Sequence, residues 1–98
     1  MLVHSVYMWL KSDASDADRR ACREALEALK DVDTVKQLWI GTPAATSGDP
    51  VDKSYDLALT AIFDDVAGEE AYQVSPLHQA FLDKFGGMLD RVRVYDAD

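Results

Sequence analysis

Apolar and polar residues alternate with a period of two in four stretches of the chain, which is the pattern of β-strands. Residues 2–10, 34–40, 54–63 and 91–95 are rich in β-branched and aromatic types and are bounded by polar or glycine-containing segments. The first and third stretches carry bulky apolar side chains at both alternating sets of positions. We therefore expect four strands in a sheet whose two faces are both covered.

Three further stretches predict helices. A first helix is expected over residues 16–30, and a short one that ends near residue 72 follows the third strand. Pro76 lacks a backbone N–H and disfavours helical geometry in the residue before it, so we expect a new helix over residues 76–85. Ser75 is the expected N-cap of that helix, with Pro76 in its first position. The apolar stripe of the first helix consists of Cys22, Ala25, Leu26 and Leu29.

The order of these elements is β-α-β-β-α-β, which predicts a single ferredoxin-like α+β domain over residues 1–98. Its two main helices can cover only one face of the sheet. Trp9 and Trp39 alternate with polar neighbours in the predicted strands and are typical of core or interface positions. We therefore predict a homodimer in which two sheets pack face to face.

The charge composition of the chain disfavours some classes of binding partner. The 98 residues contain 10 Lys and Arg against 18 Asp and Glu, which gives a net charge of −8 and disfavours nucleic acids and anionic membranes. The short acidic clusters 64–65, 69–70 and 96–98 are interpreted as solvated surface, the last of them as an acidic tail.

Three further features favour a cytoplasmic protein. The N-terminus lacks the basic and apolar regions of a signal peptide, and no apolar run approaches the ~20 residues that span a bilayer. Cys22 is the only cysteine, so an intrachain disulfide is impossible, and its neighbours predict a small buried hydrophobe.

The candidate chemistry lies in the two histidines and one tyrosine. His78 follows Pro76 in the first turn of a helix, where the unpaired backbone N–H groups disfavour an imidazolium. A neutral imidazole is suited to act as a general base. Tyr72 lies close to it in sequence. A purely structural role in core packing would explain the presence of His78 and Tyr72 equally well. The two histidines have no trio of carboxylates near them in the sequence, and we see no phosphate-binding loop, so we expect no metal and no organic cofactor.

Three segments resemble the stress-responsive dimeric α/β barrel (Dabb) family. They are residues 3–11, 54–59 and 71–78, and the likeness runs from the histidine of the first strand to the closing strand. The resemblance implies a ferredoxin-like monomer that dimerises through its sheets. It also implies varied activities, among them plant polyketide cyclases that close a linear polyketide by aldol condensation without a metal or organic cofactor.

In that cyclase branch the positions of Tyr72 and His78 form the catalytic pair, and the position of His4 belongs to the substrate pocket. This chain departs from the pattern at Ser75 and Leu57, where relatives carry histidines.

Three functions therefore stay open. The first is a domain that binds a small apolar carbonyl compound and acts as a cofactor-independent cyclase or lyase. The second is a non-catalytic oligomeric stress or scaffold protein, and the third is a monooxygenase-like relative of the same architecture. A common cavity that joins His4, Tyr72 and His78 would favour the first, whereas a closed core would favour the second.

Overall fold

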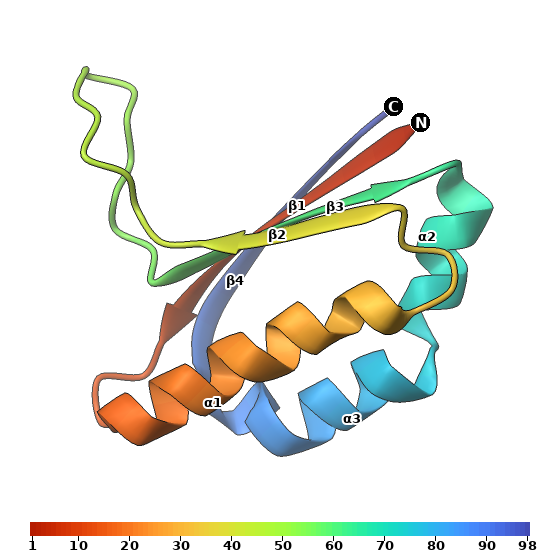
Figure 1. Cartoon of the computed structure of the whole chain (residues 1–98). Coiled ribbons are helices and arrows are strands. Elements are labelled where there is room, and N and C mark those ends of the chain that lie inside the picture. The colour runs from red at the N-terminus through yellow and green to blue at the C-terminus, as the bar shows by residue number, and fades with distance from the viewer.

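The computed structural model describes residues 1–98 as two layers, an antiparallel four-stranded sheet and a layer of helices on one of its faces (Figure 1). The strands lie in the order β2-β3-β1-β4, so the first and last strands of the chain are neighbours. This is the ferredoxin-like α+β arrangement predicted from the sequence. The elements are β1 (Leu2–Leu10), α1 (Asp16–Glu27), the 3₁₀ segment η1 (Ala28–Asp31), β2 (Gln37–Gly41), β3 (Leu57–Phe63), α2 (Val66–Gln73), α3 (Pro76–Phe85), η2 (Gly86–Met88) and β4 (Leu89–Ala97).

The core lies between the sheet and the helices, and the period-two alternation decides which strand residues enter it. The inward residues of β3 pair in register with those of β1, as Ala61 does with His4. From the helices, Cys22 and Leu26 of α1 are buried, and the prediction for Cys22 is confirmed by an exposed fraction of 0%. The buried positions of β3 are Leu57, Leu59, Ala61 and Phe63.

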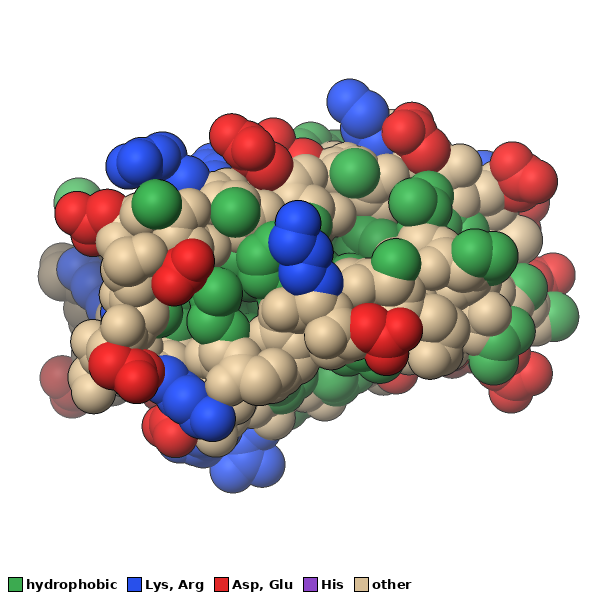
Figure 2. All heavy atoms as spheres, turned by 90° about the horizontal axis from the view of Figure 1, so that it is seen from below, with side chains coloured by type: hydrophobic (Ala, Val, Ile, Leu, Met, Phe, Trp, Pro, Cys, Tyr) green, Lys and Arg blue, Asp and Glu red, His purple; other side chains and the backbone are tan.

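The helical layer closes over this core along one seam. Seen from the helix side, hydrophobic side chains lie along the seam between α1 and α3, with charged side chains around it and one basic side chain across it (Figure 2). Ala21 and Ala25 line the α1 side of the seam, and Leu77 and Phe81 line the α3 side. The small side chains of α1 leave a shallow apolar groove between the two helices.

The junction between α2 and α3 was predicted correctly. Ser75 is the N-cap of α3, because its Oγ accepts a hydrogen bond from the backbone N–H of His78 at 3.3 Å. The same hydroxyl donates to the carbonyl of Tyr72 at 2.7 Å, so one side chain ends α2 and begins α3. Pro76 occupies the start of α3. This short turn fixes Tyr72 and His78 on facing ends of two helices.

Several boundaries differ from the expected ones. The first helix is α-helical only to Glu27 and continues as the 3₁₀ segment η1. β2 begins three residues late, since Thr34 leaves the strand path to donate its hydroxyl to the carbonyl of Gly68 at 2.7 Å. β3 begins at Leu57, because the carboxylate of Asp56 accepts from the backbone N–H of Leu10 at 2.7 Å in place of a backbone carbonyl.

The acidic tail expected at residues 96–98 is the one boundary error that bears on function. β4 pairs with β1 from Leu89 to Ala97, so Asp96 lies inside the sheet. The register places it opposite His4. The assignment of Asp96 to a tail was therefore wrong, since β4 extends almost to the end of the chain, although the Asp96 side chain is 45% exposed as expected of a surface acid.

The second face of the sheet carries no helix (Figure 1). Trp39 and Tyr95 point to this side and are 56% and 63% exposed. The loop between β2 and β3 extends from the sheet away from the helices (Figure 1). None of the helices has the length and apolar character needed to cross a membrane.

Candidate functional site

A cavity of about 230 Å³ lies between the sheet and the helices and brings together all three residues that the sequence singled out, His4, Tyr72 and His78. Eleven of its fourteen lining residues are hydrophobic. Leu82 and Val94 belong to its wall and are 42% and 48% exposed, so the cavity reaches the surface on their side. Its mostly apolar lining with a few polar groups is typical of a site for a small molecule.

Tyr72 of α2 stands between the two imidazoles. Its ring contacts that of His78 edge-on at 4.8 Å and that of His4 at 5.8 Å, measured between ring centroids. Burial raises the pKa of the Tyr72 phenol well above its ordinary value, and the nearby carboxylate of Glu69 raises it further. The hydroxyl therefore stays protonated at any physiological pH and can serve as a hydrogen-bond donor.

His78 has the opposite character, that of a proton acceptor. Burial lowers the pKa of its imidazole, and the neighbouring imidazole of His4 lowers it further whenever that ring is protonated, whereas the carbonyl of Gln73 and the carboxylate of Glu69 oppose the shift. The ring is therefore neutral near pH 7. Its Nδ1 is buried without a hydrogen-bond partner, an arrangement that costs about 1–3 kcal/mol. A bound ligand could supply the missing partner.

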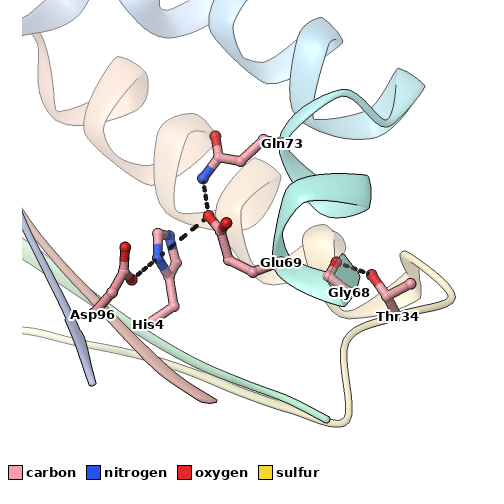
Figure 3. Close-up of polar contacts among 6 residues, drawn as sticks. All are labelled: His4, Thr34, Gly68, Glu69, Gln73 and Asp96. Carbon is pink, nitrogen blue, oxygen red and sulfur yellow. Dashed lines mark hydrogen bonds and ion pairs between the residues drawn. The ribbon is translucent and has the colours of Figure 1, made fainter. Parts of the chain in front are cut away.

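His4 is held by side chains from two other elements (Figure 3). Its Nδ1 lies 2.6 Å from Oδ1 of Asp96 on β4 and 3.8 Å from Oε1 of Glu69 on α2. Gln73, one helical turn after Glu69, donates from Nε2 to the same Oε1 at 2.7 Å. Only 2% of His4 is exposed, and the Glu69 side chain is 13% exposed, whereas the Asp96 side chain is 45% exposed and reaches the solvent.

Two carboxylates, Glu69 and Asp96, lie beside His4, which the sequence did not predict. His4, Glu69 and Asp96 offer donor atoms within 4.8 Å of one another, a combination that metal sites use. The 2.6 Å contact, however, is a hydrogen bond that requires a proton between Nδ1 and the carboxylate. A metal ion at this position would have to replace that proton. As they stand, the three side chains form a hydrogen-bonded cluster around one imidazole.

Both missed carboxylates carried a signal in the sequence. Asp96 follows Val92 and Val94 at the period-two spacing of inward positions in β4. Glu69 precedes Tyr72 by three residues, so the two share a face of α2. Neither signal could be used without the strand boundary and the helix orientation.

Neither of the two residues that depart from the family pattern lines the cavity. Leu57, where the resembling cyclases carry a histidine, is buried and pairs with Met8 but does not line the cavity. Ser75 serves as the helix cap. The titratable groups at the cavity are therefore His4, Tyr72 and His78.

Comparisons with solved structures place this fold among known proteins. A dimeric ferredoxin-like protein of unknown function from Thermobifida fusca is 22% identical, with a TM-score of 0.80 over 98% of this chain and 88% of its own. A hydroxynitrile lyase from Passiflora edulis is 20% identical, with a TM-score of 0.82 over 98% of this chain and 90% of its own. A protein described as an antibiotic biosynthesis monooxygenase is 14% identical, with a TM-score of 0.74 over 100% and 97%. At these identities the likeness shows the fold alone.

Sequence comparison gives the family. None of the curated proteins compared with the chain matches it. The family model described as the stress responsive A/B barrel domain matches residues 2–98, which is nearly the whole chain. The chain therefore belongs to the stress-responsive dimeric α/β barrel (Dabb) family.

Proposed function

We propose that the cavity binds a small apolar carbonyl compound and that Tyr72 and His78 act on it as a cofactor-independent cyclase or lyase. The observation that carries this proposal is the common cavity, in which an unpartnered neutral imidazole faces a protonated phenol. The apolar wall would bind the body of the ligand, and the few polar groups would orient its carbonyl.

The chemistry follows from the protonation states. His78 removes a proton from the carbon next to the carbonyl, and the electron pair moves to the carbonyl oxygen to give an enolate. Tyr72 donates a hydrogen bond to that oxygen, where the negative charge develops. In a cyclase the enolate carbon attacks a second carbonyl of the same molecule, and the imidazolium of His78 returns the proton to the new alkoxide. A lyase runs these steps in reverse, with His78 taking the hydroxyl proton while the carbon–carbon bond breaks.

The cavity also bears on the alternatives. A non-catalytic scaffold has no need of an apolar cavity that reaches the surface, and its core would gain stability by filling that space. A monooxygenase-like role is supported by one structural neighbour of low identity. The pairing of a general base with a hydrogen-bond donor favours carbonyl chemistry over both.

Exchange of hydrogen for deuterium at a ketone tests the proposal without knowledge of the natural substrate. Acetophenone is small and apolar, and its methyl protons lie next to the carbonyl. We expect the protein to bind it, with NMR shift changes confined to residues of the cavity, and to accelerate methyl exchange in D₂O above the buffer rate. Binding elsewhere, or exchange no faster than in buffer, would contradict the proposal.

We further propose that two copies of the chain associate through the helix-free face of the sheet. Tyr7 and Tyr95 contact each other on this face at 6.3 Å between ring centroids, and the guanidinium of Arg91 lies over the Trp9 ring at 4.6 Å. Together with the exposed Trp39 they form an aromatic surface of the kind found at interfaces. The structural neighbour from Thermobifida fusca is described as dimeric, which supports this proposal.

Sedimentation measures the proposed association. We expect the wild type to sediment as a dimer at micromolar concentration and Trp39→Glu to shift the equilibrium toward monomer, because a carboxylate would be buried between the two sheets. Val74→Glu is the matched control, since Val74 is 74% exposed at the junction of α2 and α3. A wild-type monomer, or equal dissociation of the two variants, would argue against this interface.

A further inference from the structure

The hydrogen bond between His4 and Asp96 fixes which of the two ring nitrogens of His4 carries a proton. A carboxylate carries no proton at neutral pH, so the 2.6 Å contact between Asp96 Oδ1 and His4 Nδ1 requires the proton to reside on Nδ1. The short distance is typical of a charge-assisted hydrogen bond. In the neutral imidazole, the second ring nitrogen, Nε2, is then an acceptor.

Glu69 reinforces this arrangement from the opposite layer. Its side chain is 13% exposed, and its Oε1 lies 3.8 Å from the same Nδ1. Gln73 holds that oxygen by donating a hydrogen bond at 2.7 Å (Figure 3). Two carboxylates, one from β4 and one from α2, therefore favour a proton on Nδ1, and a ring turned over by 180° would lose both interactions.

Nε2 is consequently the ring nitrogen that remains for a ligand. It makes no hydrogen bond within the protein, whereas Nδ1 is taken by Asp96. His4 lines the cavity and neither Glu69 nor Asp96 does, so the ring edge away from the carboxylates faces the cavity. The other titratable groups that face His4 are Tyr72 on α2 and, beyond it, His78 on α3.

The cavity thus offers a ligand one hydrogen-bond acceptor, Nε2 of His4, and one donor, the hydroxyl of Tyr72. We propose that the ligand carries a hydroxyl group as well as a carbonyl, with its hydroxyl donating to Nε2 of His4 and its carbonyl accepting from Tyr72. Asp96 and Glu69 are positioning residues that act through the tautomer of His4. This inference rests on the proposed function for the location of the ligand, and it adds the substrate class, a hydroxyketone.

Nitrogen-15 NMR of the side chains tests the tautomer directly, because the protein contains only two histidines. The protein is treated with a chelator and studied at pH 8, where an ordinary imidazole is neutral. We expect His4 to show a protonated Nδ1 and an unprotonated Nε2. In Asp96→Asn the amide can donate to Nδ1, and we expect the proton to move to Nε2. A wild-type His4 with its proton on Nε2 overturns the inference whether or not any ligand binds.

A matched pair of ligands tests the substrate class. 2-Hydroxyacetophenone and acetophenone differ by one hydroxyl, and neither can undergo carbon–carbon cleavage of the retro-aldol type. We expect the wild type to bind the hydroxyketone about tenfold more tightly, the effect of one added hydrogen bond in a site with a waiting acceptor. Asp96→Asn should lose that preference while it still binds acetophenone, and Glu69→Gln should reduce it.

The outcomes separate this inference from the proposed function. Equal affinity of the wild type for the two compounds overturns the inference and leaves the apolar carbonyl site intact. A preference that survives unchanged in Asp96→Asn, in a protein with a native-like amide spectrum, also overturns it. Binding of neither compound overturns both proposals.

Discussion

Replacing His78 by asparagine is expected to slow the exchange of acetophenone methyl protons by about 10²–10⁴-fold, the usual contribution of a positioned general base. The asparagine keeps a polar side chain at the start of α3 but cannot accept a proton. The backbone N–H of His78 that Ser75 caps is unaffected by the change. The loss should therefore appear in the exchange rate rather than in acetophenone affinity.

The pH dependence gives a second signature of the same base. Since burial lowers the pKa of His78 below its ordinary value of 6.5, the imidazole is the free base throughout the neutral range. The wild-type rate should hold as pH falls toward 6.5 and decline only below it, as the base becomes protonated. The residual rate of His78→Asn should lack this decline.

A second catalytic variant and one control accompany His78→Asn. Tyr72→Phe keeps the aromatic contacts with Phe63 and His78 but removes the donor to the enolate oxygen, and it should lower the rate about 10²–10³-fold. Asp83→Asn changes an exposed residue of the same helix and should leave the rate unchanged. If His78→Asn exchanged protons as fast as Asp83→Asn, another group would have to be the base.

Replacing Phe63 by alanine is expected to destabilise the protein by about 3–5 kcal/mol, as is typical of a deleted core aromatic side chain. Phe63 is fully buried at the end of β3, and its ring packs against Tyr72 at 5.1 Å and against His4 at 6.1 Å between centroids. Its removal leaves a void directly behind two residues of the cavity. Because a small domain is stable by only about 5–15 kcal/mol, this change removes a large share of the total.

Guanidinium denaturation at a single fixed protein concentration measures this loss, since the midpoint of an associating protein depends on concentration. Phe63→Leu should lose less, because leucine fills part of the space. Val51→Ala, in the exposed loop between β2 and β3, should stay within about 0.5 kcal/mol of the wild type. A loss below 1 kcal/mol for Phe63→Ala would mean that the core closes around the void.

Local patterns in the sequence were sufficient for much of the fold. The alternation in residues 2–10 and the proline at position 76 each act through short-range sterics and backbone hydrogen bonding, so β1 and the start of α3 were predicted where they lie. Ser75 was identified as a cap for the same reason. The boundaries of β2 and β3 depend on side chains from distant segments, such as Asp56 accepting from Leu10, and were misplaced.

The residues of the candidate site also fall into two groups, those found from local sequence patterns and those that depend on contacts between distant segments. His4, Tyr72 and His78 were found from the sequence because histidine is rare in this chain and because the three lie in segments with a family pattern. Asp96 and Glu69 were interpreted as solvated acids, since their spacing to Val94 and Tyr72 becomes informative only once the end of β4 and the orientation of α2 are known. Their role depends on the pairing of β1 with β4 and on the placement of α2 against the sheet.

The sequence by itself determined the order of elements and the residues able to carry proton-transfer chemistry, because these depend on patterns within a few residues. Only the tertiary structure decided that His4, Tyr72 and His78 share one cavity, and that two carboxylates 27 residues apart in the chain (Glu69 and Asp96) meet at a single nitrogen. Such contacts join side chains from different layers. They become defined only when β4 has paired beside β1 and the helices have closed over the sheet.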